Sequence, residues 1–215
     1  MLKPKIDELK QRLLDYAFLV ESMIEKSLQG LTHRDEELLR QIIAVDEVKA
    51  NRNDNEIDEI CTQLIAQYEP VAGDLRMVLM ILKMNKDLER MADHVVNISE
   101  SNAFLIKLSG YQPSEDILIM TKTAASMLKD SITAFINLDS VLAQDVCKRD
   151  NVVDDIADKI LRDLIVVMQG KKNEIKKSLH IMRVSHNLER IADLSTNLCE
   201  EVIYIVEGKD IKHHR

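Results

Sequence analysis

The sequence contains 215 residues, a length that fits either one large domain or two small ones. Its formal net charge of −8 argues against general nucleic-acid binding, because contacts with phosphate groups require a basic face. No apolar run approaches the length of a signal peptide core or of a membrane span. These features predict a cytoplasmic protein that neither binds nucleic acid nor inserts into a membrane.

Glycine and proline are scarce and mark the breaks between six predicted helices. The breaks are Pro4, Gly30, Pro70, Gly73, Gly110, Pro113, Gly170 and Gly208. The predicted helices cover residues 4–30, 34–68, 73–107, 114–138, 140–169 and 173–207. No segment alternates between apolar and polar residues with a period of two, so the sequence predicts an all-α fold.

The first predicted helix has a clear core stripe. Its members step by three and four residues, and they are Ile6, Leu9, Leu13, Tyr16, Val20, Met23 and Ser27. Long helices that are joined by short turns pack as antiparallel neighbours at a shallow angle. The pattern therefore predicts helical bundles rather than isolated helices.

An internal repeat is the strongest signal in the sequence. Residues 88–93 recur as residues 188–193, at an offset of 100, with Met91 replaced by Ile191. Earlier in each half, residues 22–24 match residues 126–128 and Asp35 matches Asp139, at an offset of 104. A few residues lost between the second and third helices of the second half would reconcile the two offsets. The sequence thus predicts two tandem three-helix bundles, residues 1–109 and 110–215.

Acidic and amide side chains lie on the side of the predicted helices that faces away from the core positions. On the third helix these are Glu89, Asp93, Asn97 and Glu100, and on the sixth they are Glu189, Asp193, Asn197 and Glu200. The second helix adds Glu47, Asn51, Asp54 and Asp58, and the fifth adds Asp150, Asp154 and Asp158. Neighbouring second and third helices would then flank an acidic groove on the outside of each bundle.

Two interpretations of the acidic stripes remain open. Like charges one helical turn apart cost a few tenths of a kcal/mol per pair, a penalty that a bound cation would remove. Oxygen ligands suit hard cations such as Fe, Mn, Mg or Ca, and His94 beside Asp93 is a further candidate ligand. The alternative is a solvated face on which Arg90 and Arg190 neutralise nearby acids.

Three cysteines, Cys61, Cys147 and Cys199, lie far apart in the sequence and within apolar helical patterns. Their odd number and the absence of a Cys-x-x-Cys motif favour buried, reduced thiols over a disulfide or a zinc site.

The chain resembles the PhoU family of phosphate-transport and phosphate-starvation regulators. The resemblance rests on the Glu-x-x-x-Asp motifs at 89–93 and 189–193, on residues 70–76, on the tandem duplication and on the closing residues 200–208. It implies two three-helix bundles with surface metal clusters, often of Fe or Zn. It also implies a non-enzymatic, cytoplasmic negative regulator that acts between the ATPase subunit of a phosphate ABC transporter and a sensor histidine kinase.

The resemblance also assigns metal ligands to positions of this sequence. One cluster would use Glu89, Asp93 and Asn97 with Glu47, Asn51 and Asp54, and the other Glu189, Asp193 and Asn197 with Asp150 and Asp154. Ala157 stands where a counterpart of Asp54 is expected, and Leu194 follows Asp193 where His94 follows Asp93. These departures lead us to expect weaker metal binding in the second repeat. Acidic grooves bridged by cations would favour a homodimer or a higher assembly.

Two other classes of protein were weighed. A ferritin-like di-metal enzyme also uses carboxylates on a helical bundle, but it needs Glu-x-x-His pairs that point into the core. No histidine of this sequence has a glutamate three residues before it, so we expect no enzyme of that class. A structural helical-bundle interaction protein without metal remains an alternative, although the repeated motif argues against it.

Overall fold

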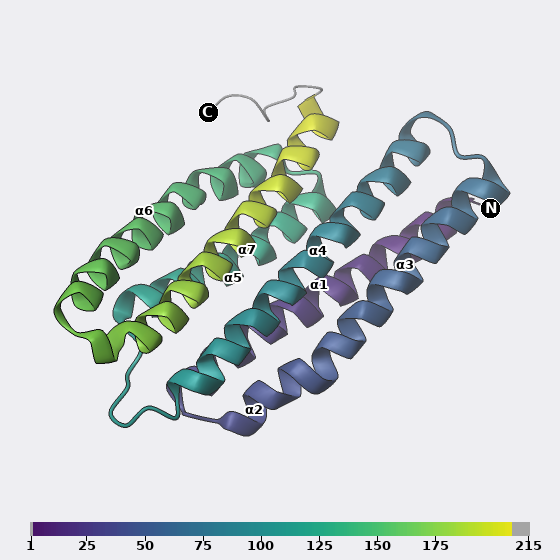
Figure 1. Cartoon of the computed structure of the whole chain (residues 1–215). Coiled ribbons are helices and arrows are strands. Elements are labelled where there is room, and N and C mark those ends of the chain that lie inside the picture. Colours follow the sequence, from purple (N-terminus) through teal and green to yellow (C-terminus); the bar gives the residue numbers. More distant parts are fainter. Residues whose placement is uncertain (1, 208–215) are drawn as a thin grey trace.

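The computed structural model describes residues 2–207, and the long helices of this part lie side by side (Figure 1). The helices are α1 (Leu2–Thr32), α2 (Glu36–Gln41), α3 (Glu47–Tyr68), α4 (Ala72–Leu105), α5 (Glu115–Asn137), α6 (Ser140–Gly170) and α7 (Ile175–Glu207). A π-helical turn, η1 (Ile42–Asp46), continues α2 into α3, and a 3-10 turn, η2 (Lys172–Glu174), precedes α7. Residues 2–207 contain no strand, which confirms the all-α prediction. The predicted break at Gly208 lies outside the described residues.

The helices form two sets of three that pack against each other. The first set contains α1, the continuous segment α2–η1–α3, and α4, and the second contains α5, α6 and α7. In Figure 1, α6, α7, α4 and α3 form one layer, and α5 and α1 lie behind it. The two sets meet through α4 against α7 and α1 against α5. The predicted boundary at residue 109 falls between α4 and α5, and no helix within residues 2–207 is apolar enough over a sufficient length to cross a membrane.

The core follows the predicted stripes. All seven stripe residues of α1 are buried, including the hydroxyl group of Ser27, which donates to the carbonyl oxygen of Ile24. On α4 the buried residues include Leu88, Met91, Val95 and Ile98, together with Ala92, Val96 and Ser99. The α4 helix also packs against α7, where Arg183 donates to Asn97 and Glu100, and His94 donates to Asn187. The side of α4 that we predicted to face outward is therefore partly an internal seam.

Equivalent aspartates begin the second helix of each set. The carboxylate of Asp35 accepts a hydrogen bond from the backbone N–H of Leu38 at 3.0 Å. Asp139 accepts from the N–H groups of Val141 and Leu142, also at 3.0 Å. Both are N-caps, which satisfy backbone donors that a helix leaves unpaired at its start. The offset of 104 found in the sequence thus corresponds to the same structural position.

The π-helical turn explains part of the difference between the two repeat offsets. Buried positions match at an offset of 104 up to Ile42 and Val146, and at 103 from Ala50 and Val153 onward. A π-helical turn accommodates one extra residue within an α-helix. We predicted the whole difference to lie between the second and third helices, but one residue of it lies inside the second helix of the first repeat.

Candidate metal centre

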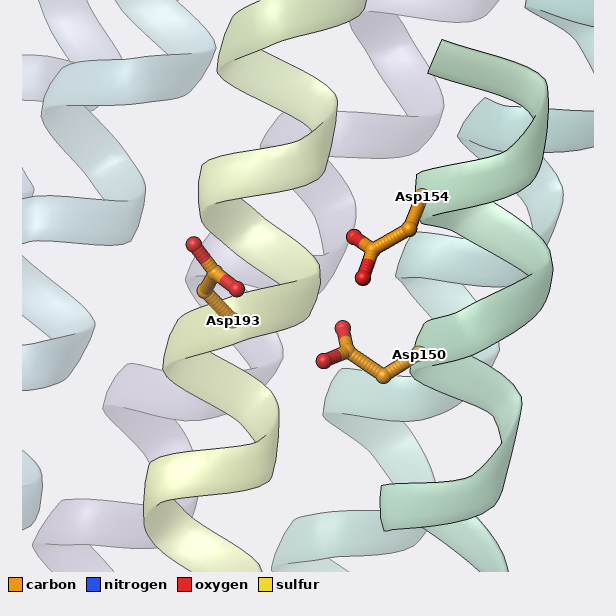
Figure 2. A group of neighbouring side chains, drawn as sticks. All are labelled: Asp150, Asp154 and Asp193. Atoms are coloured by element: carbon orange, nitrogen blue, oxygen red, sulfur yellow. The ribbon is translucent and has the colours of Figure 1, made fainter. Parts of the chain in front are cut away.

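Three carboxylates of the second repeat meet between α6 and α7 (Figure 2). Asp150 and Asp154 lie one turn apart on α6, and Asp193 on α7 faces them. Each offers one oxygen, and these three oxygens lie within 4.8 Å of one another. Two oxygens bound to one cation at about 2.0–2.6 Å cannot be more than about 5 Å apart, so the observed spacing fits a shared ion.

Burial raises the free-energy cost of holding three carboxylate charges close together. Asp150 is only 6% exposed, and Asp154 and Asp193 are half-buried. Arg190 lies at the rim, where its Nη1 atom donates to Oδ2 of Asp193 at 2.9 Å. Arg149, which precedes Asp150 on α6, pairs with other acids. Its Nη2 atom lies 2.7 Å from Oδ2 of Asp130, and its Nε atom lies 3.3 Å from Oδ2 of Asp145. Carboxylates that are this close together with limited solvent strongly favour the binding of a cation.

The first repeat holds a different group, formed by Asp54 on α3 and by Glu89 and Asp93 on α4. Burial raises the pKa of Glu89, and the charges of Asp93 and Asp54 raise it further. The buried hydroxyl group of Tyr16 feels the same three carboxylates: burial raises its pKa, and their charges raise it further. These acids are therefore electrostatic neighbours across the contact between α3 and α4.

A lysine occupies the first groove. The Nζ atom of Lys86 lies 3.1 and 3.0 Å from the two carboxylate oxygens of Asp54, and 3.9 Å from Asp58. The amide of Asn85 donates to Asp54 Oδ1 at 2.7 Å. The hydrogen bond to Asp54 raises the pKa of Lys86, so the ammonium form is favoured. A cation that binds to Asp54 would have to displace this ammonium group.

The first turns of α3, where Glu47 and Asn51 lie, differ from the prediction. Asn51 is exposed and Glu47 is half-buried, whereas the neighbouring Asp46 is fully buried. Asp46 pairs with Lys26 at 2.7 Å and with Lys49 at 3.4 Å. Sequence reasoning missed Asp46. The signal was available, because Asp46 follows the buried Ile42 by four residues, as Asp150 follows Val146.

Three predicted ligands of the first repeat instead contribute to the seam between α4 and α7. Arg183 of α7 donates to Oδ1 of Asn97, and to Oε2 of Glu100 at 2.8 Å. The Nδ1 atom of His94 donates to Oδ1 of Asn187 at 2.8 Å. Burial lowers the pKa of His94, which favours its neutral form. The packing of α7 on α4 therefore engages these side chains away from Asp54.

The remaining predicted ligands of the second repeat lie beside the three-carboxylate group but not within it. Glu189 has His186 as a neighbour at 3.7 Å, and Asp158 is exposed with Arg162 at 3.9 Å. Asn197 and Glu200 line a groove between α4 and α7. Within residues 2–207, the structure thus brings together Asp150, Asp154 and Asp193 as one possible three-ligand group. The expectation of unequal metal occupancy in the two repeats stays a prediction.

Comparisons with known proteins point to one family. The family model described as "PhoU domain" matches residues 13–101 and again residues 117–202. The protein named "Phosphate-specific transport system accessory protein PhoU homolog" from Aquifex aeolicus is 34% identical, over 97% of this chain and 94% of its own length. The homolog from Clostridium acetobutylicum is 32% identical, over 96% and 94% of the two chains. The double match confirms the predicted duplication.

Solved structures agree with this result. The crystal structure of PhoU from Pseudomonas aeruginosa has a TM-score of 0.92 and 28% sequence identity, and covers 97% of this chain and 100% of its own. The phosphate transport system regulatory protein PhoU from Streptococcus pneumoniae has a TM-score of 0.90 and 27% identity, over 98% and 99% of the two chains. The arrangement of the helices is therefore shared over nearly the whole length.

Proposed function

The chain belongs to the PhoU family, and from that premise we propose that it regulates a phosphate-specific transport system. The observation that supports this most directly is the similarity to transport accessory proteins over nearly the whole length of both chains. The relatives' names describe accessory and regulatory roles and not reactions. The three-carboxylate group also contains no histidine, unlike the ligand sets of ferritin-like enzymes. We therefore propose no catalytic activity.

The proposed role is that of a cytoplasmic adaptor with two partners, the ATPase subunit of a phosphate ABC transporter and a sensor histidine kinase. It would restrain phosphate uptake and the starvation response. Three exposed valines on one side of α6 are candidate contacts with a partner. Val141, Val152 and Val166 are 76%, 49% and 69% exposed. At 100° per residue they lie within about 40° of one another around the helix. The exposed side chains of Lys148, Asp155 and Lys159 lie between them on the same side, so this face offers apolar and charged contacts to a partner protein.

Co-purification with the two partners tests this role. The wild-type protein is expected to retain the transporter ATPase and the kinase, and Val152→Asp is expected to weaken that retention at least about tenfold, because a charge would be buried in the contact. The matched control is Val48→Asp, which places the same charge on the exposed face of α3, in the other bundle. Failure of the wild type to retain either partner would overturn the adaptor role. Equal retention by both variants would overturn only the assignment of α6.

We also propose that the second repeat binds a metal ion through Asp150, Asp154 and Asp193. The supporting observation is the convergence of their oxygens within 4.8 Å at a site with little solvent. An all-oxygen ligand set favours Mn, Mg, Ca or Fe, and is less suited to Zn, which more often takes nitrogen or sulfur ligands. In the first repeat, Asp54, Glu89 and Asp93 would bind a metal only after Lys86 moved away. Cations that bridge such sites would support a homodimer or a higher assembly.

Titration of the chelator-treated protein with Mn²⁺ tests the metal site. Asp193→Asn is expected to lower the affinity at least about tenfold, because it removes one of the three charges. Asp155→Asn is the matched control, since it removes an exposed charge next to Asp154 that is not part of the group. The proposal fails if the wild type binds no Mn²⁺, Fe, Mg²⁺ or Ca²⁺, or if the two variants bind equally well. Light scattering with and without metal tests the assembly.

A further inference from the structure

The outer sides of α1 and α5 carry a second stripe, in addition to the one that each helix turns toward its own core. The members of this outer stripe recur every seven residues, are buried or half-buried, and are apolar except for one glutamate. They are Leu14, Glu21 and Leu28 on α1, and Leu118, Ala125 and Ile132 on α5. An apolar repeat of seven residues is the pattern by which one helix packs along another. The outer stripe is therefore suited to a further pair of helices.

An open groove of about 440 Å³ lies between the two helices along the outer stripe. In Figure 1, α1 and α5 form the layer behind the other long helices. Leu28 and Ala125 line the groove between them. Its two walls carry opposite charges, from Glu21 and Glu25 on α1 and from Lys122 and Lys129 on α5. The groove thus offers apolar contacts between one acidic helix and one basic helix.

Exposed side chains flank the outer stripe on each helix. On α1 they are Phe18, which is 57% exposed, and Glu25; on α5 they are Lys122, Lys129 and Ile136, which is 51% exposed. At 100° per residue, the flanking residues of each helix lie within about 40° of one another. With an offset of 104, Lys129 takes the place of Glu25. Equivalent helices of the two repeats therefore have flanks of opposite charge.

The levels of these residues along the helices follow from one ion pair. α1 and α5 run in opposite directions, since three turns of the chain separate them (Figure 1). The Nζ atom of Lys129 lies 3.9 Å from Oε1 of Glu21, so these two residues are level with each other. Because both helices have the same rise per residue, the level of Glu25 falls between Lys122 and Lys129. By the same reasoning, the level of Phe18 falls between Lys129 and Ile136.

We propose that a second copy of the chain docks on the outer stripe, so that α1 and α5 of two protomers form a four-helix bundle. A two-fold axis parallel to the helices places α1 of one protomer over α5 of its partner and keeps each residue at its own level. Glu25 then lies between Lys122 and Lys129 of the partner. Phe18 lies between Lys129 and Ile136 of the partner. The contact pairs acid with lysine and covers the two exposed apolar side chains.

The charges select this arrangement over the other two-fold packing of the same faces. An axis perpendicular to the helices would place α1 over α1 and α5 over α5, so that Glu25 would face acids and Lys129 would face lysines. The proposed dimer also requires no metal, which distinguishes it from the cation-bridged assembly. It therefore forms in chelator-treated protein.

Sedimentation of the chelator-treated, full-length protein tests the dimer. The wild type is expected to reach twice the 24.6 kDa mass of the chain at concentrations up to about 0.1 mM. Glu25→Lys and Phe18→Ser should each raise the dissociation constant at least about tenfold, and adding Lys122→Glu to Glu25→Lys should recover part of that loss. The matched control is Glu8→Lys, because Glu8 is exposed on α1 beyond the level at which α5 ends. It should leave the dissociation constant unchanged.

A wild type that stays monomeric would overturn the proposal and leave the groove to a helix of another protein. A dimer that neither single variant weakens, or a double variant that recovers nothing, would also overturn it. Carbodiimide cross-linking of mixed labelled and unlabelled wild-type chains covers the case in which a variant does not fold. Links of mixed isotope composition from Glu25 to Lys122 or Lys129 are expected, and their absence would contradict the interface. The transport role is tested separately, since no transporter component is present.

Discussion

The two repeats place acids on the same helices but balance the charge of those acids differently. In the first repeat a lysine pairs with each buried acid, Lys26 with Asp46 and Lys86 with Asp54. At the corresponding positions of the second repeat, offset by 104 and 100, stand Asp130 and His186. The second repeat therefore lacks both lysines at the places where the first repeat uses them.

This difference gives the first repeat two lysine–aspartate ion pairs and the second repeat a group of three carboxylates suited to a cation. In the second repeat, α6 and α7 bring Asp150, Asp154 and Asp193 together, and the cation that pairs with Asp193 is the half-exposed Arg190. Arg149, which is unique to the second repeat, pairs with Asp130 instead. One helical scaffold thus supports either arrangement, and a few side chains decide between them. The following predictions test that contrast.

The largest expected effect is on the ion pair of the first repeat. Lys26→Met should lower the free energy of unfolding by about 3 kcal/mol, because the fully buried charge of Asp46 would lose its closest partner. Lys49→Met is the control, since Lys49 is more exposed and lies farther from Asp46. It should cost less than about 1 kcal/mol. Urea unfolding at pH 7 measures both variants, and equal losses would contradict the assigned roles.

A smaller effect is expected where a glycine and a leucine of the first repeat, Gly30 and Leu39, correspond to two alanines in the second. A methyl group on Gly30 would meet the side chain of Leu39 at 2.6 Å, whereas Ala134 and Ala143 occupy the corresponding positions of the second repeat. Gly30→Ala should therefore cost about 1–3 kcal/mol.

The double variant sharpens this comparison. In Gly30→Ala with Leu39→Ala the overlap disappears, so the double variant should be at least about 1 kcal/mol more stable than the sum of the single losses predicts. Gly73→Ala serves as control, because a methyl group there meets nothing within 4 Å. Additive losses of stability in thermal unfolding would show that overlap with Leu39 is not what destabilises Gly30→Ala.

The smallest effect concerns the charge of Glu89. Its pKa is raised in the folded protein, by burial and by Asp93 and Asp54, so its contribution to stability is present below pH 4.5 and is lost as the pH rises through the folded pKa. Glu89→Gln should therefore stabilise the metal-free protein at pH 7 by a few tenths of a kcal/mol. The difference from the wild type should vanish near pH 4, as measured by urea unfolding at both pH values. A less stable variant at pH 7 would contradict this electrostatic account.

Much of the fold was predictable because it depends on local sequence. The seven-residue stripe of α1 is buried as predicted, and Asp35 and Asp139 cap equivalent helices. The duplicated motif identified α4 and α7 as equivalent elements, and the family model matches both halves. Helix periodicity and caps depend on a few neighbouring residues, and a duplication is visible when the two halves of the sequence are compared, so the sequence contains all three directly.

The site was predictable only in part, because it depends on how helices that are distant in sequence meet. Sequence placed Asp150, Asp154 and Asp193 on acidic stripes, but it did not distinguish them from Asn97 and Glu100, which Arg183 engages in the seam.

By itself, the sequence determined the helices, their buried faces, the duplication and the family. The tertiary structure alone decided that Lys86 pairs with Asp54 in the first groove and that Asp46 is buried beside Lys26. The physical reason is that a helix sets the direction of each side chain around its own axis, whereas contacts between helices also require their relative rotation and axial shift. The extra residue at η1 changes that register by one position, which no periodic pattern reveals.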